Sequence, residues 1–221
     1  MRSDWGFACA ARVALYMLLA ALPGLQLRGA DGDCSRSNGI TVAATATSAT
    51  SISLFWQVTP GLGGKPVTPY VLFRGTSPAN LAQLAKTAKP LYADVGLQPA
   101  TTYLYLVEAA VDGTVVSGSA CATTPPFPNA PYDVTATPLS TTEVTLSWAQ
   151  KIDPNSLAIS EFRVYGGTSP SDLTQVATVQ AVSATLNVSA GVTYYYIVVA
   201  VDVDGDSSPA SAVIQVTMPS H

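Results

Sequence analysis

The chain of 221 residues repeats itself at a spacing of 92 positions, and this repeat restricts its fold more than any other feature. Trp56 recurs as Trp148, and the turn Gly75-Thr76-Ser77-Pro78 recurs as Gly167-Thr168-Ser169-Pro170. Matching anchors that keep one spacing over a long stretch indicate two copies of one folding unit, each of roughly ninety residues.

Each copy contains runs in which apolar and polar residues alternate, which is typical of a strand with one buried face. Ile52, Leu54 and Trp56 alternate with Ser51, Ser53 and Phe55, and Val144, Leu146 and Trp148 alternate with Glu143, Thr145 and Ser147. Gly, Pro, Asn and Asp clusters separate these runs. We therefore expect about seven strands per copy, no helix, and a two-sheet sandwich with Trp56 and Trp148 in the core.

The N-terminus has the pattern of a secretory signal peptide, which we assign to residues 1–30. Arg2 and Arg12 precede an apolar run at 13–25, which is too short to cross a bilayer as a helix. No later stretch is long and apolar enough to span a membrane. The expected location of the mature chain is outside the cell, in the periplasm or at the cell surface.

Four prolines in the seven residues 125–131 favour a stiff, extended connection between the copies. The expected organisation is a first domain at 31–124, a linker at 125–131 and a second domain at 132–221.

The charge inventory excludes several classes of protein. Only 11% of residues are charged, and Lys+Arg number 10 against Asp+Glu 14, which argues against a coiled coil and against a nucleic-acid binder. The only histidine is the terminal His221, so histidine-based catalysis and histidine-ligated metal are not expected. The acids of the second copy fall in loops and at strand edges. We expect no enzyme activity and no cofactor.

The copies resemble fibronectin type III domains, over almost the whole of the chain after the signal peptide. The first copy carries Trp56, a strand at 70–74 and the pattern Leu97-x-Pro99-x-Thr101-x-Tyr103. This resemblance implies an immunoglobulin-like, seven-stranded β-sandwich in each copy, with Tyr103 in a tyrosine corner. Tyr194 keeps the place of that tyrosine in the second copy, but the residues before it depart from the pattern, which implies a weakened corner. The Gly-Thr-Ser-Pro turn resembles copies in secreted bacterial proteins.

Cys34 and Cys121 are the two cysteines beyond the signal peptide, in a chain expected in an oxidising compartment. Cys34 precedes the first strand, and folding this tail back along the last strand would bring it to Cys121. We predict a disulfide between them. Two separate thiols or an intermolecular bond are the alternatives.

Three acids surround a glycine near the end of the second copy, namely Asp202, Asp204 and Asp206 around Gly205. Alternating carboxylates in a turn form a weak calcium candidate. No Glu follows at the twelfth position, and such a loop is also a good solvated turn.

The strands expected at 103–109 and 194–201 are apolar on both of their faces, whereas a solvated sheet face should be polar. Their outward side chains and the neighbours on the strands expected at 70–74 and 162–165 form a predicted interaction face: Phe73, Leu104, Leu106, Tyr165, Tyr195, Ile197 and Val199. The alternative is that loops, or long side chains such as Arg74 and Arg163, cover this surface.

The sequence therefore predicts a secreted, non-catalytic interaction or adhesion module that binds a protein or a surface polymer through this face. A structural spacer without a ligand and an accessory carbohydrate-binding module are the alternatives. The identity of the partner does not follow from the fold.

Overall fold

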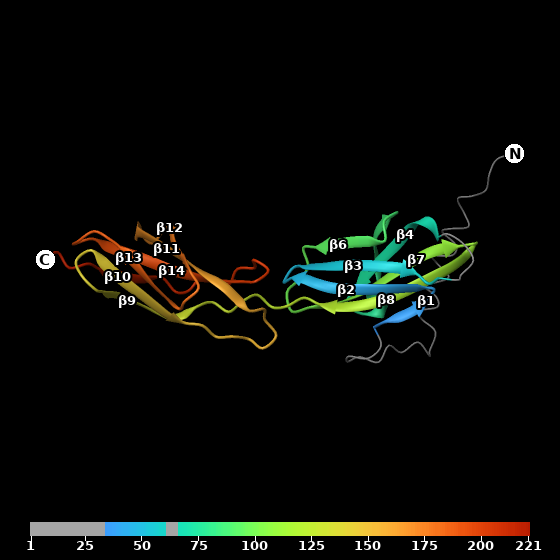
Figure 1. Cartoon of the computed structure of the whole chain (residues 1–221), viewed down its shortest axis with the longest axis horizontal. Helices are drawn as coiled ribbons and strands as arrows, with labels where there is room; N and C mark the ends of the chain where they lie inside the picture. Colours follow the sequence, from blue (N-terminus) through green and yellow to red (C-terminus); the bar gives the residue numbers. More distant parts are fainter. Residues whose placement is uncertain (1–33, 61–65) are drawn as a thin grey trace. The chain divides into compact units, whose positions relative to one another are not determined.

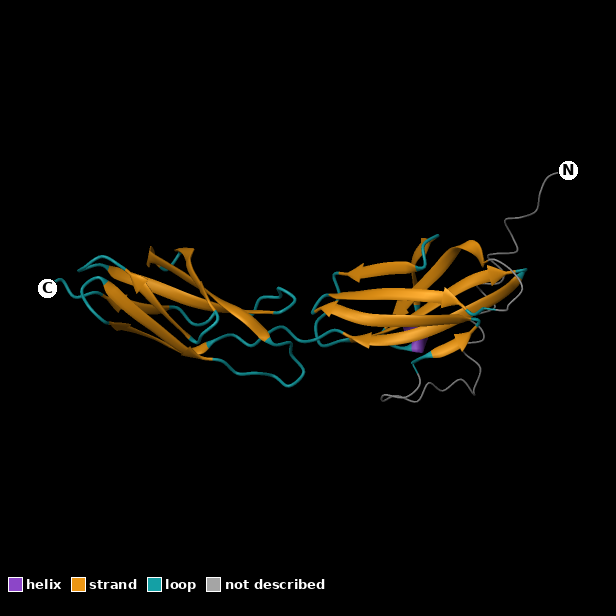
Figure 2. Cartoon of the chain, viewed as in Figure 1, coloured by secondary structure: helices purple, strands orange, loops and turns teal. Residues whose placement is uncertain are grey.

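The computed structural model of the chain describes residues 34–60 and 66–221, and within them regular structure is almost entirely β (Figure 2). The only helix in these ranges is the single 3-10 turn η1, Pro78–Asn80. The expected signal peptide at 1–30 lies outside the described residues. The chain divides into two compact units, and the second contains all residues from Thr124 onward together with the short segments Thr47–Thr50 and Leu97–Ala100.

The first unit is a sandwich of a five-stranded and a three-stranded sheet, and most of their strands are labelled in Figure 1. The five-stranded sheet has the order β1 (Arg36–Asn38), β8 (Thr114–Thr123), β7 (Thr102–Val111), β4 (Pro66–Gly75), β5 (Ala82–Thr87). The three-stranded sheet has the order β2 (Ile40–Ser48), β3 (Ser51–Val58), β6 (Leu91–Val95).

The chain changes sheets between β1 and β2. Gly39 permits this change because its φ of 87° lies in the left-handed region, which glycine adopts without strain. A Cβ on Gly118 of β8 would collide with the carbonyl of Ile40, so the crossing also depends on a glycine in the facing strand. The first unit thus gains β1 as an eighth strand beyond the seven expected.

The second unit is a sandwich of a three-stranded and a four-stranded sheet. The first has the order β13 (Ser183–Asn187), β10 (Glu143–Ala149), β9 (Tyr132–Pro138). The second has the order β12 (Asp172–Val179), β11 (Ile159–Ser169), β14 (Thr193–Asp202), β15 (Ile214–Thr217). These seven strands repeat the order of β2 to β8.

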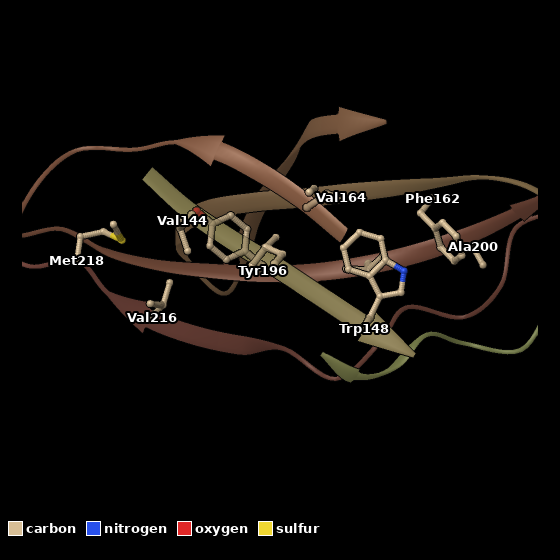
Figure 3. Close-up of a cluster of buried hydrophobic side chains, with 11 residues drawn as sticks. Val144, Trp148, Phe162, Val164, Tyr196, Ala200, Val216 and Met218 are labelled. Atoms are coloured by element: carbon tan, nitrogen blue, oxygen red, sulfur yellow. The ribbon is translucent and has the colours of Figure 1, made fainter. Parts of the chain in front are cut away.

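The apolar residues of the alternating runs, such as Ile52, Leu54 and Trp56, fill the space between the sheets in both units. Trp56 contacts Tyr70 edge to face at 5.5 Å between ring centroids, and Trp148 contacts Phe162 in the same way at 5.4 Å. Figure 3 shows Trp148 in the core of the second unit, on the side of its strand that faces Val164 and Phe162. The predicted fold class is confirmed: the chain is all-β, with two fibronectin type III-like sandwiches in tandem.

Candidate functional site

A disulfide joins Cys34 to Cys121, with 5.3 Å between the Cα atoms, as the sequence predicted. It holds the N-terminal segment against β8, and β1 then pairs with β8 in antiparallel register. Two hydrogen bonds extend this attachment, because Ser119 Oγ donates to the Cys34 carbonyl at 2.9 Å and the Arg36 N–H donates to Ser119 Oγ at 3.2 Å.

The disulfide lies on the outer face of the first unit, next to residues that the sequence predicted to be accessible there. Leu104 lies directly opposite Cys121 on the neighbouring strand, and residues opposite each other in an antiparallel pair share a face. Only 7% of Leu104 is exposed. The prediction that Leu104 presents an accessible apolar surface is therefore wrong, since this part of the face lies beside the protein's own disulfide. Phe73 and Leu106 remain half-buried.

Arg74 does not cover the outer face, so it does not support the alternative in which long side chains shield that surface. It lies opposite Tyr105, whose side chain is buried between the sheets. Arg74 Nη1 donates to Asp94 Oδ1 at 2.8 Å and to Oδ2 at 3.1 Å. Its guanidinium carbon also lies 5.7 Å from the centre of the Tyr103 ring, within range of a cation–π contact.

Asp94 completes a buried polar cluster that the sequence analysis missed. The Tyr105 hydroxyl donates to Asp94 Oδ2 at 2.8 Å. Burial, followed by this hydrogen bond, raises the pKa of Tyr105 far above its ordinary value. The alternation of inward and outward residues along β6 could have indicated this cluster. Asp94 stands at an inward position of that strand, opposite the buried Ile52 of β3.

The outer face of the second unit keeps the predicted apolar row. Tyr165 of β11 lies opposite Ile197 of β14, and Tyr195 and Val199 flank Ile197 on the same face. All four side chains are half-buried, which shows that neighbouring side chains shield them in part without closing the face. Arg163, the side chain expected to offer cover, is opposite Val199.

One end of this row is polar. Arg163 Nε donates to Glu161 Oε1 at 2.8 Å, and both side chains are about one-third exposed. Glu161 lies opposite Val201, which is buried. The apolar row therefore ends at an ion pair on the Val201 side.

The second unit contains the hydrogen bond of a tyrosine corner, although the residues before Tyr194 depart from the pattern of the first copy. The backbone N–H of Ser189 donates to the Tyr194 hydroxyl at 3.0 Å. This bond needs only a backbone donor at the right place in the turn, so the loss of the Leu, Pro and Thr of the first copy does not prevent it. Tyr194 also stacks on Tyr196 at 6.2 Å between ring centroids.

The acidic loop of Asp202, Asp204 and Asp206 is held together by hydrogen bonds between its own residues. Asp202 is buried, and its Oδ1 accepts the N–H groups of Asp204 at 3.0 Å and Asp206 at 2.9 Å. Burial raises the pKa of Asp202, and these backbone bonds oppose that shift. Across residues 34–60 and 66–221, no group of three or more His, Cys, Asp or Glu side chains is placed to hold a metal ion.

A groove of about 470 Å³ opens in the second unit beside β12 and β13, and its walls carry no acid, histidine or cysteine. Its lining consists of Gly166, Gly167, Val176, Ala177, Thr185, Leu186, Asn187, Val188, Tyr194 and Tyr196. Gly166 and Leu186 stand 92 positions after Arg74 and Asp94. The groove thus lies where the first unit places its ion pair, and its walls offer no carboxylate pair for acid–base chemistry.

Comparison with known proteins gives one curated relative. The chain is 27% identical over 194 residues to chitinase A1 of Niallia circulans, which covers 82% of this chain and 25% of that protein. The chain therefore spans about a quarter of the relative's length. No protein-family model matches the sequence. No helix in the described part of the chain is long and apolar enough to cross a membrane.

The similar solved structures are fibronectin type III domains. The FN1–FN3 domains of chicken CNTN1 align with a TM-score of 0.46 and 17% identity, over 80% of this chain and 66% of that one. A two-domain segment of chicken tenascin aligns with a TM-score of 0.37 and 17% identity, over 80% and 97%. The strand order of both units, rather than these alignments, gives the chain its fold: two fibronectin type III-like sandwiches in tandem.

Proposed function

We propose that the chain is a secreted, non-catalytic interaction module that binds a protein or a surface polymer through the second unit. The binding face is the outer side of the sheet β12-β11-β14-β15. The observation that carries this proposal is the half-buried apolar row of Tyr165, Tyr195, Ile197 and Val199, which lies on one face and crosses two paired strands.

The energetics support binding at this row. Monomeric proteins seldom expose a large contiguous apolar patch without a role for it. Burial of this row together with the partner surface that contacts it, about 400 Å² in all, would contribute ~10 kcal/mol before the costs of association. Those costs consume much of this value, and micromolar affinity would remain. The Glu161–Arg163 pair supplies a polar border of the kind that surrounds many interfaces.

A location outside the cell follows from the same proposal. The Cys34–Cys121 disulfide suits an oxidising compartment, and we assign residues 1–30 to a signal peptide. The proline-rich segment 125–131 would act as the linker between domains at 31–124 and 132–221. Similarity to a protein of Niallia circulans supports a bacterial source.

The similarity to chitinase A1 favours one second candidate. A non-catalytic unit that accompanies a polysaccharide-acting protein could bind the polysaccharide itself. Tyr165 and Tyr195 are the aromatic side chains of the proposed face that could stack on a sugar ring. A spacer without a ligand would show no saturable binding to any partner.

The test compares two double variants of the second unit. Tyr195→Ser with Ile197→Thr changes the proposed face, whereas Thr145→Ala with Thr185→Ala changes the outer side of the opposite sheet, where the two threonines are hydrogen-bonded. Binding is measured by co-sedimentation with insoluble chitin, cellulose and cell-wall polymer, and by surface plasmon resonance with proteins recovered from the extracellular fraction.

We expect the first double variant to lose at least tenfold in affinity and the control variant to bind like the wild type. Equal binding by both variants would exclude this face as the interface. Binding to chitin alone would select the carbohydrate-binding candidate, and saturable binding to none of these partners would select the spacer.

A further inference from the structure

The most exposed apolar cluster of the first unit lies on the sheet opposite to the predicted face. Phe55 and Leu91 are each 54% exposed and lie directly opposite each other on β3 and β6. Val95, further along β6, is 70% exposed. Ala93 lies between Leu91 and Val95 on the same side, so the whole outward side of β6 is apolar.

Strand β6 is also the last strand of its sheet. Among residues 34–60 and 66–221 it pairs with β3 on one side, and no strand pairs with its other edge. An open edge is a template for another strand, and proteins usually protect it with outward charges, proline or a covering segment. None of the outward side chains of β6 is charged or is proline.

The second unit provides an internal comparison, because β13 holds the same place in its sheet. Its outward residues are Ser183, Thr185 and Asn187, at the positions 92 after Leu91, Ala93 and Val95. The exposed pair of Phe55 and Leu91 is replaced there by Ser147 opposite Ser183. The two units thus share the edge strand, and only the first presents an apolar one.

Charge does not oppose contact at β6, although the chain as a whole has a net charge of −4. The only charged residue of the strand is Asp94, which is 3% exposed and is paired with Arg74 inside the sandwich. Two copies can therefore bring their β6 strands together without placing carboxylates against each other.

We propose that β6 pairs with β6 of a second copy of this chain, antiparallel about a two-fold axis at Ala93. This register places Leu91 opposite Val95 of the second copy and Ala93 opposite its own counterpart. Every outward side chain then meets an apolar one, as an isologous contact requires. The product is one continuous sheet of six strands, three from each copy, on a surface separate from the face proposed above.

The available area limits the strength of this dimer. Phe55, Leu91 and Val95 each expose about 100 Å², which amounts to roughly 600 Å² for two copies. A stable interface buries about 1,200–2,000 Å². The edge of a five-residue strand adds only part of the difference, so we expect a reversible dimer that dissociates in the micromolar to millimolar range.

A cysteine cross-link tests the register. Directly opposed residues of antiparallel strands have Cα atoms about 4.5–5.5 Å apart, within the range of a disulfide. Under mild oxidation, the full chain with Ala93→Cys should form covalent dimers at least tenfold faster than the chain with Thr185→Cys, its match in the second unit. Equal rates would overturn the proposed pairing.

Sedimentation equilibrium tests the surface without a new thiol. The wild-type chain should show concentration-dependent dimerisation that Leu91→Lys with Val95→Lys weakens at least tenfold. Ser183→Lys with Asn187→Lys should dimerise like the wild type. Circular dichroism melts verify that both variants fold, and Phe55→Ser, one strand from the edge, replaces the first variant if it does not. A wild-type chain that stays monomeric up to millimolar concentration overturns the proposal.

Discussion

The buried cluster of Arg74, Asp94 and Tyr105 makes a quantitative prediction about the stability of the first unit. The Asp94 carboxylate is 3% exposed and accepts hydrogen bonds from both partners, while the Arg74 side chain keeps 34% of its surface in contact with solvent. The two charges therefore differ in how well water can replace a lost partner.

Asp94→Leu leaves the Tyr105 hydroxyl without its acceptor but lets the Arg74 guanidinium turn towards water. We expect a loss of ~2–4 kcal/mol in the free energy of unfolding. Arg74→Leu costs more, ~3–5 kcal/mol, because the carboxylate stays buried without a cation. The double variant, in which apolar groups fill the site, should lose only ~0–2 kcal/mol, since the second unit folds with Gly166 and Leu186 at these places.

The assay is urea unfolding followed by hydrogen exchange and mass spectrometry, which measures the two units separately. The four proteins form a double-mutant cycle, and we expect a coupling energy of at least ~2 kcal/mol between Arg74 and Asp94. Coupling below ~0.5 kcal/mol would refute the reasoning. So would a double variant that is less stable than either single variant.

Three further perturbations follow from the same structure. Trp148→Ala should lower the free energy of unfolding of the second unit by ~3–5 kcal/mol in urea, and a loss below ~1 kcal/mol would mean that the indole does not hold the sheets together. Replacing Cys34 and Cys121 by serine should cost the first unit ~4 kcal/mol, because the bond closes a loop across 87 residues, and thermal unfolding of the second unit should not change. Burial raises the pKa of Glu108 above 4.5, so its carboxyl contributes stability that is fully present below pH 4.5 and is lost as the pH rises through the folded-state pKa. Glu108→Gln should therefore be more stable than the wild type at pH 7 and equal to it near pH 4, and a wild type that is more stable at pH 7 would contradict this sign.

The sequence by itself determined the repeat, the strands and the inward side of most of them. Alternation marked Ile52, Leu54 and Trp56 as core residues, and the matching run in the second unit did the same, because a strand points successive side chains to opposite faces. The Cys34–Cys121 bond also followed from the sequence, since a segment before the first strand could reach the last one. These properties depend on local geometry and on the length of the chain.

Only the tertiary structure decided which outward side chains are accessible. The alternation along its strand predicted that Leu104 faces outward. Its side chain is nevertheless buried, beside a disulfide formed by a segment 70 positions earlier. Asp94 stands at an inward position of its strand, but the alternation of residues does not show that Arg74 neutralises it there. Phe55 and Leu91 became one exposed pair through the register of β3 with β6. Exposure and ion pairing depend on contacts between residues that are distant in sequence, and a periodic pattern carries no information about the partner on the neighbouring strand.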